Sequence, residues 1–262
     1  MKKFKENFRG FWELTLEMTK NDIKARYKNA VFGFLWIFLN PLLQMLIIGL
    51  IFQNFIKIPL TNYFIFLFAG LLPWNFFSYS LTKATPSFVF ERNLIQKAKF
   101  PRAAIPLSIV FSNFFHFIIS LLLFILFLLF THQLLLFSSL IKICFFFGSL
   151  IWIFIFTSSL SLLSSTLNVK YRDINFLVQA LVILWFYATP VIYSLQILPE
   201  RYLVFFQINP LAYPFEMLRF SLIASFLPHI KIFLANFISS LLVIFLGIFF
   251  FKKESKNFSD WL

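Results

Sequence analysis

The chain has 262 residues, of which 60% are hydrophobic and only 13% are charged. Soluble domains carry about 25% charged residues, so this composition excludes a soluble protein. The net charge of +13 could suggest a nucleic-acid partner, but lysine and arginine gather between long apolar runs, where they fit membrane orientation and anionic lipid headgroups instead. We therefore predict an all-α protein that crosses a membrane several times, contacts membrane lipids and binds no nucleic acid.

Residues 2–20 have the period of an amphipathic helix. Phe4, Phe8, Phe11 and Met18 share one face, while charged side chains share the opposite one. A helix with this distribution lies in the headgroup plane of a membrane rather than spanning the bilayer. We therefore predict an N-terminal interface helix.

Six apolar segments are candidates for membrane-spanning helices. They cover residues 31–55, 63–82, 104–131, 141–167, 174–193 and 230–251. If the N-terminus is inside, the segments facing the cytoplasm carry 18 lysine and arginine residues and those facing outwards carry 5. This asymmetry obeys the positive-inside rule, so both termini are expected in the cytoplasm of a plasma (inner) membrane protein. The serine-rich stretch 157–166 should allow close helix packing.

The region 190–229 is broken by prolines yet remains apolar between them. Irregular backbone at membrane depth persists only where it is buried in protein or lines an aqueous cavity. We therefore predict a re-entrant hairpin of two short helices on the outer side, with a loop lying flat on the surface as the alternative. Glu216 and Arg219 are three residues apart in the second short helix and can pair there.

Motifs for catalysis and for energy coupling are absent from the sequence. It contains no GxxxxGK[ST] phosphate-binding loop, and charged residues are missing from the centres of the six apolar segments. Cys144 and the histidines His116, His132 and His229 show no metal-ligand spacing, so the histidines are expected at packing or interface positions. Energy, if used, must come from another chain. A membrane enzyme acting on lipid-linked sugars is a rival hypothesis, but it would need an acidic cluster or a metal site.

A series of short motifs extends over most of the chain. They are Asp22-Ile-Lys-Ala-Arg26-Tyr27, Gly33-Phe-Leu-Trp36, Asn40-Pro41-Leu42, Gly70-Leu-Leu-Pro73-Trp74, Asn93-Leu-Ile-Gln-Lys97, Phe100-Pro101-Arg102, Pro106-Leu-Ser108, Tyr171-Arg172-Asp173-Ile174, Trp185-Phe-Tyr187, Thr189-Pro190-Val-Ile-Tyr193 and Asn209-Pro210-Leu211. In the order of these motifs, the chain resembles the membrane subunit of polysaccharide-export ABC transporters. These are type-2 ABC permeases that move O-antigen, capsule or teichoic-acid polymers.

The resemblance implies a homodimer bound to two copies of a separate cytoplasmic ATPase. That partner would hold ATP and Mg²⁺, whereas this chain would bind no cofactor or metal and would have no catalytic residue. Contacts that couple the two proteins would lie in the loops 83–102 and 168–173. The charged residues expected there are Glu91, Arg92, Lys97, Arg172 and Asp173. Membrane topology alone is the alternative explanation for these charges.

The resemblance further implies that the first and fifth spans face a polymer path at the dimer centre. Aromatic rings and small polar groups can hold sugars weakly while a long chain slides past. The path residues we predict on this basis are Trp36, Asn40, Gln44, Trp185 and Tyr187. Packing or interfacial roles for these side chains are the alternative.

Two further sets of residues follow from the same resemblance. The pyrophosphate of a lipid-linked glycan would enter near Arg26, Tyr27, Lys28 and Arg102, although the positive-inside rule alone would also place the basic residues there. The outer hairpin would form an external gate that includes Pro190, Tyr193, Pro210, Glu216 and Arg219.

The sequence thus predicts one type-2 ABC permease domain over residues 1–262. Its parts are the interface helix and cytoplasmic approach (1–29), five spans (30–189), the gate hairpin (190–229), and the last span with a cytoplasmic tail (230–262). The predicted function is the channel-forming subunit of an ATP-driven exporter of a lipid-linked polysaccharide. An exporter of a small lipophilic compound or drug shares the fold and is the alternative.

Overall fold

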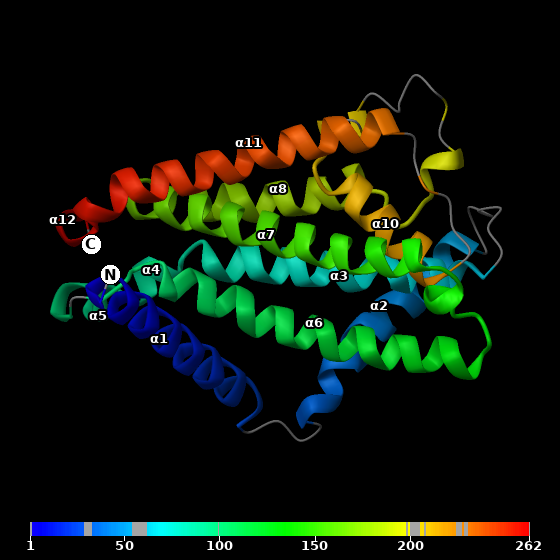
Figure 1. The fold of residues 1–262 in the computed structure, drawn as a ribbon, viewed down its shortest axis with the longest axis horizontal. Coiled ribbons are helices and arrows are strands. Elements are labelled where there is room, and N and C mark those ends of the chain that lie inside the picture. The colour runs from blue at the N-terminus through cyan, green and yellow to red at the C-terminus, as the bar shows by residue number, and fades with distance from the viewer. Residues whose placement is uncertain are drawn as a thin grey trace.

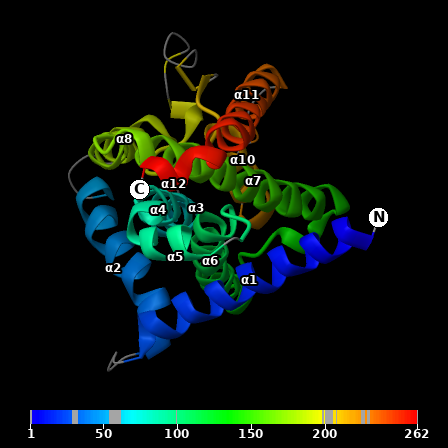
Figure 2. The same ribbon diagram turned by 90° about the vertical axis from the view of Figure 1, so that its left-hand side faces the viewer.

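The computed structural model describes residues 2–28, 33–53, 62–98, 100–197, 199, 205–206, 208–223, 227 and 230–261. Within these ranges every regular element is helical. The long helices run along one common direction, and α1 (Lys2–Tyr27) lies obliquely across them (Figures 1 and 2). We call the end of the molecule where α1 begins the terminal end, because α12 (Phe258–Trp261) lies there too, and the opposite end the far end.

Six helices occupy the positions of the six apolar segments. They are α2 (Trp36–Ile51), α3 (Tyr63–Ala84), α6 (Ala104–Phe130), α7 (Leu140–Lys170), α8 (Ile174–Ala188) and α11 (Ile230–Glu254). Among the described residues, α3, α6, α7 and α11 are long and apolar enough to cross a membrane. The protein is therefore a multi-pass membrane protein. With 16 and 15 residues, α2 and α8 are shorter, and the predicted positions 31–32 and 54–55 lie outside the described residues.

Two predicted helix ends were wrong. The fifth segment was expected to continue to residue 193, but α8 ends at Ala188 because Thr189 is extended before Pro190. A residue that precedes proline is disfavoured in the α conformation, which explains the early end. The first helix continues to Tyr27 instead of ending near residue 20. The side chains of Phe4 and Phe8 lie outside those described, so their predicted face is not observed.

Helix α3 is the centre of the bundle (Figure 2). In its apolar window 78% of the residues are buried, against 22% in α11, which lies at the periphery. Close packing between α7 and α11 depends on small residues, as the serine-rich stretch predicted. A Cβ atom on Gly247 would lie 2.4 Å from the carbonyl oxygen of Ser159, so only glycine permits this approach.

The described residues also form several short helices. They are η1 (Gly33–Leu35), α4 (Ser87–Phe90), α5 (Arg92–Lys97), η3 (Leu136–Ser138), η4 (Leu195–Ile197), α10 (Ala212–Leu222) and η5 (Ser255–Asn257). Helix α10 is buried against α3, α7 and α11 at the far end, so a short helix exists where the second helix of the hairpin was predicted. Most of the first predicted helix lies outside the described residues.

Candidate substrate path and the clusters around it

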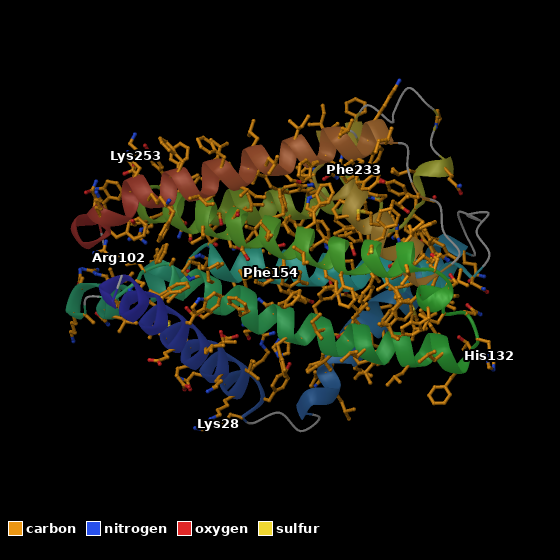
Figure 3. The ribbon with its side chains drawn as sticks, viewed as in Figure 1. Lys28, Arg102, His132, Phe154, Phe233 and Lys253 are labelled. Carbon is orange, nitrogen blue, oxygen red and sulfur yellow. The ribbon has the colours of Figure 1, made fainter. Side chains whose placement is uncertain are left out.

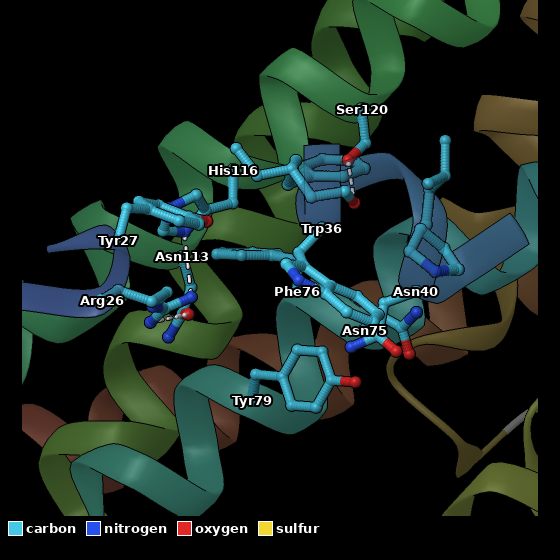
Figure 4. Close-up of a pocket in the computed structure, with 14 residues that line it drawn as sticks. Arg26, Tyr27, Trp36, Asn40, Asn75, Phe76, Tyr79, Asn113, His116 and Ser120 are labelled. Atoms are coloured by element: carbon cyan, nitrogen blue, oxygen red, sulfur yellow. Dashed lines mark hydrogen bonds between the residues drawn. The ribbon is translucent and has the colours of Figure 1, made fainter. Parts of the chain in front are cut away.

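A cavity of about 290 Å³ lies between α2, α3 and α6, beside the end of α1 (Figure 4). It brings residues of the predicted pyrophosphate entry together with residues of the predicted polymer path. Arg26 and Tyr27 of the first set line it, as do Trp36 and Asn40 of the second. Further polar residues of its lining are Asn75, Tyr79, Asn113, His116 and Ser120. The predicted approach of the cargo and the start of the predicted path therefore meet in one space.

Arg26 connects α1 to α6. Its Nη1 lies 3.0 Å from Nδ1 of His116, and its Nη2 donates to Oδ1 of Asn113 over 3.0 Å. The ring of Tyr27 meets the ring of His116 edge to face, with centroids 5.4 Å apart. Burial raises the pKa of Tyr27, so its phenol stays protonated at neutral pH. The last turn of α1 thus presents a cation and a neutral aromatic ring to the cavity.

Asp22, one turn before Arg26, organises the neighbouring contact. It pairs with Arg26 at 3.4 Å and accepts a hydrogen bond of 2.5 Å from Ser112 of α6. Lys83, at the end of α3, approaches its other oxygen to 3.9 Å. Thr19 is buried on the same face of α1, where its hydroxyl lies 3.3 Å from the carbonyl oxygen of Ser108 in α6 and also contacts the carbonyl oxygen of Thr15. Helix α1 is therefore held to the bundle partly by polar contacts, which the predicted phenylalanine face did not anticipate.

A second pocket of about 370 Å³ adjoins the first along α3 and lies between α2 and α8. Asn75 and Tyr79 line both pockets. Gln44 accepts a 2.9 Å hydrogen bond from Asn75 and donates to Tyr79 over 3.5 Å, while Tyr187 lines the same pocket from α8. Four of the five predicted path residues therefore border two neighbouring pockets with a shared polar wall.

Trp185, the fifth predicted path residue, is placed differently. Its ring meets that of Phe77 at 5.2 Å, and its Nε1 donates to Oδ1 of Asn209 over 3.0 Å. These contacts fit a packing role, which was the alternative for this residue. Its neighbour two positions on, Tyr187, is exposed.

The four residues predicted near the pyrophosphate are not all together. Lys28 is exposed at the end of α1, next to Arg26, whereas Arg102 lies at the terminal end (Figure 3). There Arg102 donates to the carbonyl oxygen of Ser255, and its guanidinium carbon lies 5.7 Å from the ring centroid of Phe258. Arg102 therefore holds the C-terminal segment, and only Arg26 and Tyr27 of this set line the cavity.

The charged residues predicted to couple to a partner are all exposed and lie near the terminal end (Figures 1 and 2). Glu91, Arg92 and Lys97 belong to the short helices α4 and α5 and the turn between them. Arg172 and Asp173 belong to the turn between α7 and α8. The two loops thus expose charged residues at the same end of the molecule.

Two of the predicted gate residues, Glu216 and Arg219, form a buried ion pair at the far end. Arg219 and Glu216 are 3.0 Å apart and have 0% and 1% of their side chains exposed, which confirms the predicted pairing. Arg219 also donates to the carbonyl oxygens of Pro190 and Val191. Its guanidinium carbon lies 3.8 Å from the ring centroid of Phe66. Arg219 therefore ties the turn after α8 to α10.

We call the contact of Arg219 with Glu216 and with the carbonyl groups of Pro190 and Val191 the far-end lock. Sequence reasoning missed the residues that complete it. A Cβ atom on Gly70 would lie 2.0 Å from Nη2 of Arg219, so this position must lack a side chain. Tyr63 donates to the carbonyl oxygen of Ile192 over 2.8 Å, and Asn209 donates to that of Ala188 over 2.9 Å. Two other predicted gate residues make separate contacts: Tyr193 donates to the carbonyl oxygen of Tyr187 over 2.6 Å, and the carbonyl oxygen of Pro210 accepts from Ser240 over 3.4 Å.

The comparison with known families defines the class of protein. A model of the ABC-2 type transporter family matches residues 13–223, so the chain belongs to this family of membrane transport subunits, which pair with an ABC ATPase. An O-antigen export system permease protein RfbA from Klebsiella pneumoniae is 35% identical over 223 residues, which is 80% of both chains. A protein of the same name from Myxococcus xanthus is 34% identical over 193 residues, which is 72% of this chain and 71% of that protein.

Proposed function

We propose that this chain forms the channel of an ATP-driven exporter that moves a lipid-linked polysaccharide out of the cytoplasm across the plasma membrane. Two copies would assemble with two copies of an ABC ATPase. The terminal end would face the cytoplasm, where the positive-inside rule places both termini. Helix α1 would lie at the membrane interface. Relatives named as O-antigen export permeases support this cargo class.

The observation that carries the proposal is the pair of adjoining pockets. Their linings combine aromatic rings with neutral amides and hydroxyls, the groups that can hold sugars weakly. The wall that they share, Asn75 and Tyr79, gives a sliding polymer hydrogen-bond partners without a fixed charge. Apart from the cation of Arg26 at its start, the amides and hydroxyls among the aromatic side chains of this path support a hydroxyl-rich chain as the cargo, and a small lipophilic compound is the alternative.

A second copy of the chain would close this path. Helices α2 and α8 carry exposed apolar side chains, including Ile47, Leu50 and Leu184. At 1.5 Å per residue these two helices extend only about 24 Å and 22 Å, short of a hydrocarbon core of about 30 Å. As helices they are therefore shorter than the four long candidate spans. Pairing α2 and α8 with those of a second copy would bury the apolar faces and enclose the pockets.

The mechanism that follows uses both ends of the molecule. ATP binding would close the partner dimer against the charged terminal surface, where Glu91, Arg92, Lys97, Arg172 and Asp173 are exposed. The two copies would then rock apart around the path. The outer turn held by Arg219 would form the external gate. Polymer would thread outwards, and its lipid end would follow last.

The test is the location of lipid-linked glycan in a strain that lacks this protein. The proposal predicts that finished polymer accumulates on the cytoplasmic side while the cell surface is bare, and that the wild-type gene restores export. A surface polymer unchanged by the deletion would contradict a polysaccharide cargo and favour the small lipophilic compound.

A further inference from the structure

A small apolar core lies at the terminal end, separate from the main core of the bundle (Figures 1 and 2). Among the described residues, its buried members come one each from α4, α5, α6, α7 and α12, and they are Phe88, Ile95, Ile105, Val169 and Phe258. Phe258 is 0% exposed, and its ring centroid lies 4.7 Å from that of Phe88. Because each helix supplies a single buried residue, the main effect of this core is to join the helices to one another.

Two residues of the core lie within the loops whose charges were predicted to couple to an ATPase. Ile95 is 3% exposed and lies in α5 between the exposed Arg92 and Lys97. Val169 is 2% exposed and lies in the last turn of α7, just before the turn that carries the exposed Arg172. Each loop therefore exposes charges and buries one apolar side chain, and the two buried side chains belong to the same core.

The elements η5 and α12, which follow α11 and which we call the tail, connect the two loops. Helix α12 contacts both α5 and α7. Arg102, just before α6, donates to the carbonyl oxygen of Ser255, and its guanidinium carbon lies 5.7 Å from the ring centroid of Phe258. Nζ of Lys170 lies 5.5 Å from the ring centroid of Trp261, close enough for a cation–π attraction. The tail is therefore held to the start of α6 and to the end of α7, with Phe258 between these contacts.

We propose that Phe258 is a positioning residue for the partner ATPase: through Ile95 and Val169 it holds the two charged loops in one arrangement that is ready to dock. The inference needs no particular cargo, and it rests on the proposed function only for the place where the ATPase docks. Two loops that are already in place bind more tightly than loose ones. Binding then need not order them, and once one has docked the other meets its contact at a high effective concentration.

The competing explanation is that the tail only covers the end of α11 and leaves the loops unaffected. Phe258→Ala separates the two roles, because it removes the shared ring and keeps every exposed charge of the loops. Phe258→Leu keeps a bulky apolar side chain in the core and is the conservative rescue. Phe249→Ala makes the same change on α11, where Phe249 is 49% exposed, and is the matched control.

The first measurement is hydrogen exchange in the full-length chain in phosphatidylcholine nanodiscs. In Phe258→Ala the amides of α5 and of the last turn of α7 should exchange about tenfold faster, because local opening no longer has to break the shared core. Exchange in α10, at the far end, should stay as in the wild type. Phe258→Leu should recover most of the protection, and Phe249→Ala should match the wild type. Unchanged exchange in both loops of Phe258→Ala would overturn the proposal.

The second measurement titrates the fluorescently labelled ATPase onto the same nanodiscs. A positioning role changes how tightly the ATPase binds, so Phe258→Ala should raise the midpoint of the titration about tenfold and leave its plateau unchanged. A merely structural loss would instead inactivate a fraction of the molecules, which lowers the plateau at the same midpoint. A midpoint equal to that of the wild type, with or without a lower plateau, would overturn the docking role.

Trp261→Ala gives the same test in a milder form, which keeps the proposal testable if Phe258→Ala does not fold. It removes the contact with Lys170 and leaves Phe258 in place, so both readouts should shift in the same direction by less. No shift in either readout would count against the tail as the connection between the loops.

The docking surface of the proposed function is tested separately by Arg172→Ala, which removes an exposed charge and leaves the core intact. If the ATPase docks on the two loops, this variant should raise the midpoint of the titration without changing hydrogen exchange in α5. An unchanged midpoint would contradict the docking surface. The exchange data for Phe258→Ala would then still decide whether this residue joins the loops.

Discussion

Arg26 in α1 and Arg219 in α10 each follow an acidic partner by one helical turn, yet they lie in opposite surroundings. Arg26 and Asp22 are 3.4 Å apart with 26% and 29% of their side chains exposed, beside an open cavity. Arg219 and Glu216 are 3.0 Å apart and have 0% and 1% exposed. The first pair keeps part of its hydration, whereas the second has lost nearly all of it.

The difference indicates which contact can rearrange. A partly hydrated ion pair contributes little to stability, so the end of α1 can shift at low cost. A buried pair whose partner is removed leaves an uncompensated charge, which is expensive. The buried pair at the far end should therefore hold its present arrangement firmly, whereas the partly hydrated pair at the end of α1 should rearrange more easily.

The largest effect is expected from breaking the buried pair. Arg219→Leu leaves Glu216 without its cation and removes the donors to the carbonyl oxygens of Pro190 and Val191. The free energy of unfolding should fall by about 3–5 kcal/mol. Thermal unfolding in detergent measures this loss. The double variant Glu216→Leu with Arg219→Leu should recover part of it, and a single variant as stable as the wild type would refute the lock.

A smaller effect is expected from filling the space beside the guanidinium. In Gly70→Ala the new Cβ atom would lie 2.0 Å from Nη2 of Arg219 and 2.8 Å from the carbonyl oxygen of Val191. Overpacking of this kind costs about 1–3 kcal/mol. The control is Gly148→Ala, whose Cβ atom would meet only Met217 at an ordinary 3.5 Å. Equal unfolding midpoints for the two variants would show that the lock tolerates a side chain.

The contact at the end of α1 should respond to salt. Asp22→Asn removes the charge that faces Arg26 and Lys83, and the expected loss at low ionic strength is about 1 kcal/mol. Because the pair is partly exposed, salt should reduce this difference. The loss caused by Arg219→Leu should not change with salt. The comparison fails if the two variants show the same salt dependence.

The smallest effect belongs to the exposed pair Glu17 and Lys20, which are 2.6 Å apart on α1. The hydrogen bond from Lys20 lowers the pKa of Glu17. A lowered carboxyl pKa stabilises the folded state above the unfolded value of about 4.3 and loses that contribution as the pH falls through the folded value. Glu17→Gln should therefore unfold like the wild type at neutral pH within error. A clear difference there would show that exposed pairs on α1 matter more than expected.

The sequence predicted the helices better than the contacts between them. Long apolar runs locate α3, α6, α7 and α11 because length and hydropathy are local properties. The end of α8 was missed although Pro190 is visible in the sequence. Periodicity also could not tell that Trp185 packs inwards, since that depends on where Phe77 and Asn209 lie.

The residues of the candidate site, too, could be predicted from the sequence only in part. Arg26, Trp36, Asn40 and Gln44 could be singled out because the family resemblance implies that cargo enters near the first and that the first span, which carries the other three, faces the polymer path. Asn113 and His116 are also polar residues within an apolar segment, a signal that could have found them. Gly70 gave no such signal, because its role depends on Arg219, which is distant in sequence and meets it only in the fold.

The most direct test of the central claim places a photo-reactive phenylalanine analogue at position 40, in the lining of the first cavity, in cells that are exporting. The matched control carries the analogue at position 237, where Phe237 is exposed on the peripheral helix α11. If the pockets form the export path, illumination should join glycan to the protein at position 40 and not at position 237. Adducts at both positions alike, or none at position 40, would contradict the proposed path.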